Sequence, residues 1–157
     1  MSGQSLFSGQ ANLTFDRQIL SSLIELAHDA VLERDPASTI ITWNRGAEEI
    51  YGWTAQEAIG QTTHSLLQTR FPESREALDS VLARGEQWEG ELVHTRRNGA
   101  EVIVESRQVL MRDEQDQPFA ILEINRDITE RKQQEQENQE QYRTIVRTAN
   151  EGIWLVD

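Results

Sequence analysis

Three histidines, His28, His64 and His94, are the side chains in this sequence best suited to metal binding or proton transfer. His28 and His94 do not have the spacing of a metal-binding pair. The chain has no cysteine, which excludes disulfides, thiolate metal sites, cysteine nucleophiles and cofactors attached through a cysteine. We therefore predict no metal site.

Carboxylates also gather near His94, in a segment whose hydrophobic residues alternate like those of a strand pair. An acid/base pair could be imagined among them, but they fall on the presumed outer, solvated face of that hairpin. These residues are Glu89, Glu91, Glu101 and Glu105. The sequence also lacks a nucleophile–base pair, a phosphate-binding loop and metal-ligand spacing, so we expect no enzyme active site in this chain.

The overall composition argues against several classes of binding partner. A chain of 157 residues supports one compact domain with flanking elements. Its net charge is −12 and no stripe of lysine and arginine occurs, which argues against nucleic acid and anionic membrane surfaces. No stretch of about 18 apolar residues is present, and the start lacks the features of a signal peptide. We expect a cytoplasmic location and no direct membrane contact.

The elements of the first half are short. Apolar residues from Phe15 to Ala27 recur at helical spacing, and two short strands, 30–33 and 39–43, should follow. Asn44 and Thr54 are typical N-cap residues, so we predict one helix after each of them. The first of these ends near Gly52 and the second near Gly60.

In the second half the hydrophobic period changes from 3.6 to 2. Pro72 suits the first turn of a longer helix that Gly85 ends. Three strands are then predicted at 88–95, 101–111 and 119–125. This order of elements predicts an α+β domain, with an antiparallel sheet whose helices are grouped on one face.

Three segments together resemble a PAS domain. They are WNRGAEEIYGWTAQEAIG at 43–60, GEQWEGELVHTRRNGAEV at 85–102 and RDITERK at 126–132. The resemblance implies a five-stranded antiparallel sheet in the order 2-1-5-4-3, with helices enclosing a small pocket on one face. It also implies a sensory or dimerisation module upstream of a histidine kinase, diguanylate cyclase or chemoreceptor output domain.

The resemblance also gives a map of the pocket. In PAS relatives that bind flavin, the polar position two residues before the motif Asp points into the pocket, and here that position is Asn125. Strand alternation extends this inner face and turns Leu122 and Ile124 outward. The inner-face candidates are Trp88, Leu92, His94, Val104, Ser106, Gln108, Ile121, Glu123 and Asn125. Either they bind a small ligand, or they satisfy one another and water in a ligand-free core.

Glu123 needs a partner or a proton if it faces inward, because a buried unpaired carboxylate is costly. Arg45 and His94 are the candidates that sequence position suggests.

The sequence does not identify a cofactor, but it argues against several candidate cofactors. Haem-binding PAS relatives carry the iron ligand on the long helix before the Gly-Glu turn, and the segment 73–84 contains no histidine. We expect His64 to be a surface or capping residue instead. Photochemistry that needs a cysteinyl flavin adduct is excluded. Unattached flavin stays open as an alternative, although a LOV-like pocket would need polar side chains where Val104 stands.

The motif residues Asp127 and Thr129 stand where the last strand must become a helix, and each can cap backbone N–H groups there. In the family, this step joins the domain to the outgoing signalling helix. The following KQQEQENQEQ, residues 132–141, has no apolar seam, so we expect a solvent-exposed helical connector. We also predict a homodimer that packs residues 15–26 on Leu122 and Ile124.

The end of the chain repeats a pattern from its beginning. IVRTANEGIWLVD at 145–157 aligns with LIELAHDAVLERD at 23–35. We interpret the second copy as the start of another PAS module, whose exposed apolar residues should be ordered only against another surface. The predicted division is therefore an N-terminal polar segment and helical cap over 1–19, a PAS domain over 20–131, and a connector with a truncated second module over 132–157. On this reading the chain is a fragment of a longer protein, which carries the downstream PAS and output domains.

Overall fold

The computed structural model describes residues 18–20, 22–24 and 27–156, with burial assigned to side chains as far as Glu151. Residues 18–20 and 22–24 are helical, within the helix predicted over Phe15 to Ala27. Phe15 and Leu26 lie outside the described residues. No helix in the described part of the chain is long and apolar enough to cross a membrane.

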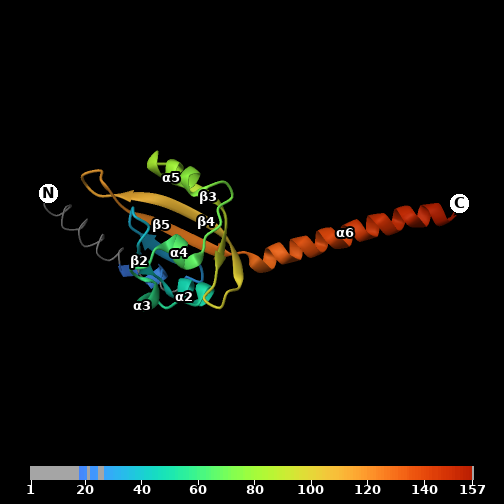
Figure 1. Cartoon of the computed structure of the whole chain (residues 1–157), viewed down its shortest axis with the longest axis horizontal. Coiled ribbons are helices and arrows are strands. Elements are labelled where there is room, and N and C mark those ends of the chain that lie inside the picture. Colours follow the sequence, from blue (N-terminus) through green and yellow to red (C-terminus); the bar gives the residue numbers. More distant parts are fainter. Residues whose placement is uncertain (1–17, 21, 25–26, 157) are drawn as a thin grey trace, which may run out of the picture.

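A five-stranded antiparallel sheet forms the centre of the domain (Figure 1). Its strands are β1 (Ala30–Arg34), β2 (Ile40–Trp43), β3 (Trp88–Thr95), β4 (Glu101–Arg112) and β5 (Pro118–Asp127). Their order across the sheet is β2-β1-β5-β4-β3, which confirms the order implied by the resemblance. The first and last strands in the sequence, β1 and β5, therefore lie side by side in the middle of the sheet.

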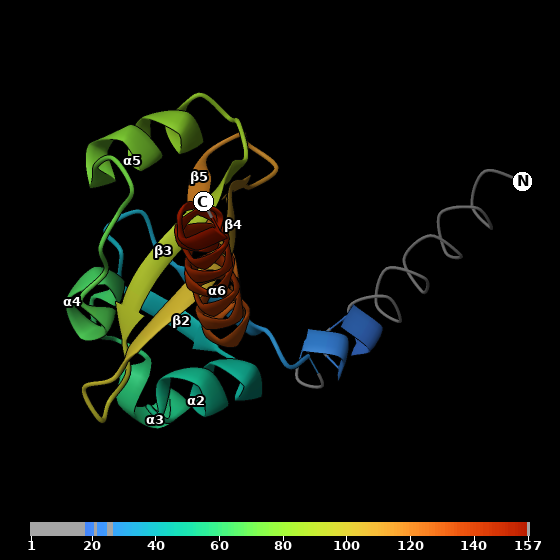
Figure 2. The same ribbon diagram turned by 90° about the vertical axis from the view of Figure 1, so that its right-hand side faces the viewer.

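Four short helices connect β2 to β3 and lie on one face of the sheet, as predicted (Figure 2). They are α2 (Arg45–Tyr51), α3 (Ala55–Ala58), α4 (Thr63–Leu67) and α5 (Arg75–Ala83). Asn44 and Thr54 cap α2 and α3, and Thr54 forms a reciprocal capping box with Glu57.

The predicted position of Pro72 in the first turn of α5 is wrong. The helix begins at Arg75, after the N-cap Ser74, whose side chain accepts a hydrogen bond from the backbone N–H of Ala77. Serine satisfies a free N–H group of the first turn, whereas proline has no such acceptor, so the local sequence favours the later start.

Asn44 also fixes the segment that leads into β1. Its Oδ1 accepts from the backbone N–H groups of Val31 and Ala47, and its Nδ2 donates to the carbonyls of Ile24 and Asp29. Next to it, a Cβ atom on Gly46 would lie 2.1 Å from the Asp29 carbonyl oxygen. Only glycine allows this close approach of α2 to the backbone before β1.

The hydrophobic core lies between the sheet and the helices. One cluster centres on β1, α2 and the β3–β4 hairpin, and a smaller one lies beneath α5. Phe71 and Trp88 pack against both clusters. The polar residues described below interrupt this apolar layer on its sheet side.

The last helix, α6 (Thr129–Val156), projects away from the domain (Figure 1). It continues through residues 152–156, where the sequence predicted a bend and a strand, so the prediction of a strand at these residues is wrong. A strand needs a neighbouring strand for its backbone hydrogen bonds, whereas a helix satisfies them internally. The second PAS copy is therefore not shown.

Candidate functional site

The nine residues predicted for the inner face come together there. Trp88 is half-buried and the other eight are buried. Gln108 stands opposite Glu123 and Ser106 opposite Asn125 across the β4–β5 pair. On the other side of β5, Leu122 is half-buried and Ile124 is 37% exposed. The alternation proposed for this strand therefore has the right phase.

A chain of hydrogen bonds links α2 to the sheet. Asn125 Nδ2 donates to the Tyr51 hydroxyl (3.0 Å), which lies 2.7 Å from His94 Nδ1. The direction of the bond between the Tyr51 hydroxyl and His94 Nδ1 depends on the tautomer of the imidazole. All three side chains are fully buried.

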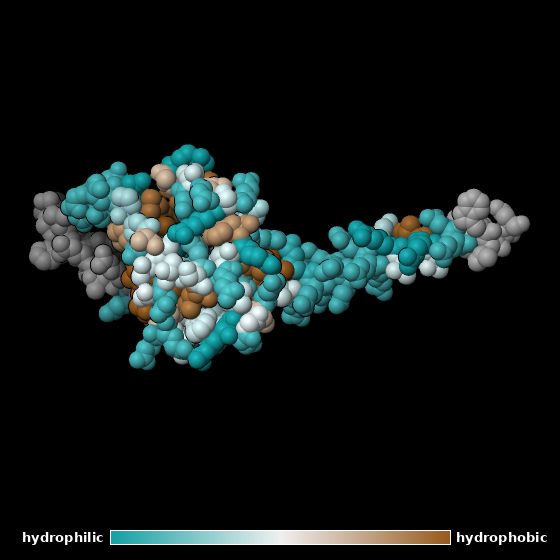
Figure 3. Space-filling model, in the orientation of Figure 1, coloured by the Kyte–Doolittle hydropathy of each residue, from teal (hydrophilic) through white to brown (hydrophobic). Residues whose placement is uncertain are grey.

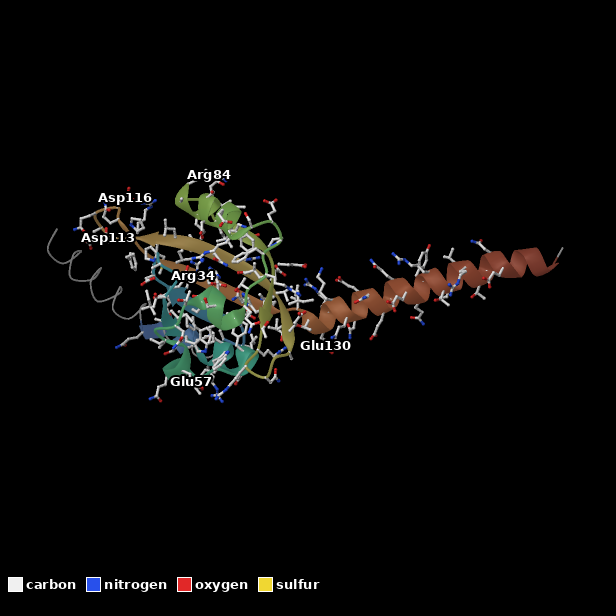
Figure 4. All side chains as sticks on the ribbon, in the orientation of Figure 1. Arg34, Glu57, Arg84, Asp113, Asp116 and Glu130 are labelled. Atoms are coloured by element: carbon white, nitrogen blue, oxygen red, sulfur yellow. The ribbon has the colours of Figure 1, made fainter. Side chains whose placement is uncertain are left out.

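A second polar group surrounds Arg34, which β1 places on the same inner face. Its Nη2 donates to Gln108 Oε1 (2.7 Å), and its Nη1 donates to Ser38 Oγ (3.2 Å). Its Nε lies 3.5 Å from Glu123 Oε2, which forms an ion pair too long for a good hydrogen bond. Figure 4 shows Arg34 within the body of the domain, near α4.

Arg34 is therefore the partner of Glu123, and the sequence-based candidates were wrong. Arg45 is exposed and pairs with Glu49, whereas His94 bonds to Tyr51. Arg45 stands in the first turn of α2 and so cannot follow the alternation of a strand. Arg34 was missed, although Ala30 and Leu32 point inward and strand alternation puts Arg34 on the same face.

Four buried polar atoms in this site have no hydrogen-bond partner among the described residues: Arg34 Nε, His94 Nε2, Glu123 Oε2 and Asn125 Oδ1. Two of them, Arg34 Nε and Glu123 Oε2, face each other in the 3.5 Å ion pair. Burial lowers the pKa of His94 to about 3 and raises the pKa of the Tyr51 phenol well above its ordinary value. Both groups are therefore uncharged near neutral pH. His94 Nε2 and Asn125 Oδ1 are therefore the atoms of this site that can bond a small polar group.

His64 differs from the prediction of a surface or capping residue. It is partly buried, its ring meets Phe71 edge-on at 5.0 Å, and its Nδ1 lies 3.4 Å from Thr69 Oγ1. Burial, followed by the positive charge of Arg34, lowers the pKa of His64 to about 4. Its Nε2 atom is buried without a partner among the described residues.

The carboxylates on the outer face form exposed ion pairs. Glu101 pairs with Arg70 and Glu89 with Arg107. The other two face the first turns of α6, with Lys132 Nζ 2.8 Å from Glu91 and Arg131 Nη2 3.6 Å from Glu105. These two ion pairs hold the base of α6 against the β3–β4 hairpin.

Asp127 and Thr129 form the joint between β5 and α6. Asp127 Oδ1 accepts from the Thr129 backbone N–H (3.0 Å), and Thr129 Oγ1 accepts from the N–H of Ile103 on β4 (3.0 Å). Thr129 therefore ties the helix to the sheet rather than capping its own first turn.

Arg96 extends this joint to α2. Its Nη2 lies 3.2 Å from Asp127 Oδ2, and its Nη1 donates to the carbonyl of Ile50 (2.7 Å). The neighbouring Arg97 N–H donates to the carbonyl of Tyr51 (2.8 Å). A continuous set of contacts thus connects the Tyr51 side chain in the core with the start of α6.

Farther along, α6 carries an exposed apolar patch made of Tyr142, Ile145 and Val146. Figure 3 shows the hydrophobic surface returning there after a polar stretch that begins at the domain. In this structure the patch lies away from the sheet of its own domain (Figure 1), so that sheet is not the surface that orders it.

Known proteins with similar sequences and structures share this architecture. The chain is 25% identical over 128 residues to the methanogenesis regulatory histidine kinase FilI of Methanothrix harundinacea, a match that spans 82% of this chain and 14% of that protein. It also resembles the crystal structure of the PAS domain of a protein from Colwellia psychrerythraea (TM-score 0.62, 30% identity, 72% of this chain and 97% of that one). An RNA-binding light-oxygen-voltage receptor shares the fold (TM-score 0.69, 22% identity, 80% of this chain and 37% of that one).

The family comparison agrees with the sheet order and the position of the helices. A family model described as the PAS fold matches residues 24–133, which include all five strands and the joint to α6. The chain belongs to the PAS family.

Proposed function

We propose that this chain is the sensory module of a signal-transduction protein, in which a small molecule binds the polar inner face and α6 carries the response. The observation that carries this proposal is the presence of two buried polar atoms, His94 Nε2 and Asn125 Oδ1, that have no partner among the described residues, next to the long Arg34–Glu123 ion pair. A buried polar atom left unpaired costs about 1–3 kcal/mol, so a bound polar group would stabilise the domain.

The contacts around Arg96 support a route from this site to the output. Asn125 bonds to the Tyr51 hydroxyl, while the carbonyls at the end of α2 bond to Arg96 and Arg97. Since Arg96 also pairs with Asp127, a shift of Tyr51 on binding would reach the first turn of α6. The roles of Asp127 and Thr129 as the joint for transmission are part of this proposal.

A histidine kinase is the output favoured by the relative from Methanothrix harundinacea, although the chain spans only 14% of that protein. A diguanylate cyclase remains the second candidate. A cytoplasmic location and a downstream second PAS module remain predictions from the sequence.

The alternative is a ligand-free module for dimerisation and transmission. It is favoured by exposed apolar residues on the outer sheet face and on the helix before β1, namely Ile124, Ile19, Leu20 and Leu23. On this alternative, the polar inner face would bind only water, which requires two to four polar partners for each molecule.

One purified sample distinguishes the two functions. We expect denaturation to release a small molecule in near-stoichiometric amount, detected by mass spectrometry and an absorption scan. Release of no molecule, combined with a dimer in sedimentation that the double variant Leu20→Asp, Leu23→Asp abolishes, would favour the ligand-free module. A monomer at tens of micromolar that is unchanged by those substitutions would count against the dimer interface.

A further inference from the structure

Two arginines converge on one serine at the edge of the polar inner face. Ser38 Oγ accepts from Arg34 Nη1 (3.2 Å) and from Arg75 Nη2 (2.9 Å). These residues come from β1, the turn after it and the first turn of α5, so three elements place them together. Ser38 itself is buried and holds a left-handed backbone conformation (φ 70°), which is uncommon for a residue other than glycine.

The hydroxyl that joins the two guanidinium groups carries no charge. Arg34 has Glu123 as its buried carboxyl partner, and among the described residues Arg75 pairs with Asp79, at 3.6 Å on an exposed helix face. No carboxylate of the described residues pairs with both guanidinium groups, which meet at the uncharged Ser38 hydroxyl. Like charges at such a site repel, and an oxyanion bound by both would relieve the repulsion.

The surroundings suit a small organic acid. Arg75 has a side chain 42% exposed, so it lies at the boundary between solvent and the buried Arg34. Burial, and then the charges of Arg34 and Arg75, lower the pKa of the nearby His64, and within the described residues its Nε2 has no hydrogen-bond partner. Phe71, which meets His64 edge-on, supplies adjoining apolar surface.

We infer that the ligand carries a carboxylate head group, which Arg34 and Arg75 bind beside Ser38. This inference rests on the proposed sensory function and adds the chemical class of the signal. Guanidinium groups recognise carboxylates through paired N–H donors, and Arg34 Nη1 and Arg75 Nη2 both point to the place beside Ser38. The rest of the ligand would extend over Phe71 toward Glu123 and Asn125.

The test is thermal unfolding of the whole chain titrated with sodium acetate, benzoate or succinate, with sodium chloride and neutral benzamide as controls. We expect at least one carboxylate to raise the midpoint saturably. Arg75→Gln should weaken its apparent affinity at least ~10-fold, because a charged hydrogen bond is lost. Arg84→Gln, at the exposed far end of α5, is the matched control and should bind like the wild type (Figure 4).

Two results would overturn the inference. One is the absence of any shift with these carboxylates beyond that of chloride or benzamide. The other is an equal shift in wild type and Arg75→Gln, which would indicate binding elsewhere. If denaturation releases an uncharged molecule, the sensory function stands and only the carboxylate head group is rejected. If denaturation releases no molecule and no carboxylate probe binds, the sensory function and the carboxylate head group are both rejected.

Discussion

Replacing Glu123 by leucine should lower the free energy of unfolding by about 3–5 kcal/mol, because the Arg34 guanidinium would remain buried without its carboxyl partner. Arg34 and Glu123 are each 1% exposed, and Asn125 Nδ2 also donates to Glu123 Oε1. Urea unfolding of wild type and variant measures the difference.

The double variant Arg34→Met, Glu123→Leu separates the lost pair from lost packing. It should recover much of the stability, since apolar residues of similar size can replace a buried ion pair at little cost. A matched surface control is Glu86→Leu, which removes the exposed partner of Arg84 and should cost less than about 1 kcal/mol. If the loss of stability in the double variant equals the sum of the losses in Arg34→Met and Glu123→Leu, the two residues do not depend on each other. That result would contradict a buried ion pair.

The free energy of unfolding should fall by about 2 kcal/mol for His94 alone between pH 7 and pH 5, with a smaller contribution from the less buried His64. Burial lowers the pKa from 6.5 to about 3 for His94 and to about 4 for His64. Between those values and 6.5 the unfolded chain binds more protons than the folded domain. Stability is therefore present above pH 6.5 and is lost as the pH falls toward the folded pKa values.

Urea unfolding at pH 7, 6 and 5 checks this dependence. His94→Gln and His64→Gln should each flatten it, with the larger effect for His94→Gln. If His94→Gln does not fold, His64→Gln still provides the comparison. His28→Gln, which changes an exposed histidine, is the control. The same pH dependence in wild type, His94→Gln and His64→Gln would contradict the assignment of buried neutral imidazoles.

Much of the sheet could be predicted because its signals are local. Alternating hydrophobic residues and the Asn98-Gly99 turn place β3 at Trp88 to Thr95, as the structure has it. The same alternation predicted that the side chains from Asn125 back to Ile121, at every second residue, lie on the inner face. Caps at Asn44 and Thr54 were likewise readable, since a cap depends on residues three positions apart.

Pairings between distant residues could not be predicted in this way. Arg34 meets Gln108, which is 74 positions away, and Tyr51 meets Asn125 at the same separation. Such contacts depend on how the central strands bring both ends of the domain together. The tail shows a different limit, because residues 152–156, predicted as a bend and a strand, are helical in the structure.

We propose that the polar core communicates with α6 through the end of α2, Arg96 and Asp127. Hydrogen exchange of Tyr51→Phe tests this connection, because the change removes the hydroxyl that bonds Asn125 and His94 and costs about 1–3 kcal/mol. Thr54→Ala, which breaks the capping box of α3, is a control that costs about 1 kcal/mol.

The amides to follow are those of Ile103, Thr129 and Lys132, which bond at the joint and in the first turn of α6. We predict that these three amides exchange faster in Tyr51→Phe than in wild type, and that Thr54→Ala leaves them near their wild-type rates. Unchanged exchange at all three amides in Tyr51→Phe, or the same increase in both variants, would contradict the proposed connection between the core and the helix.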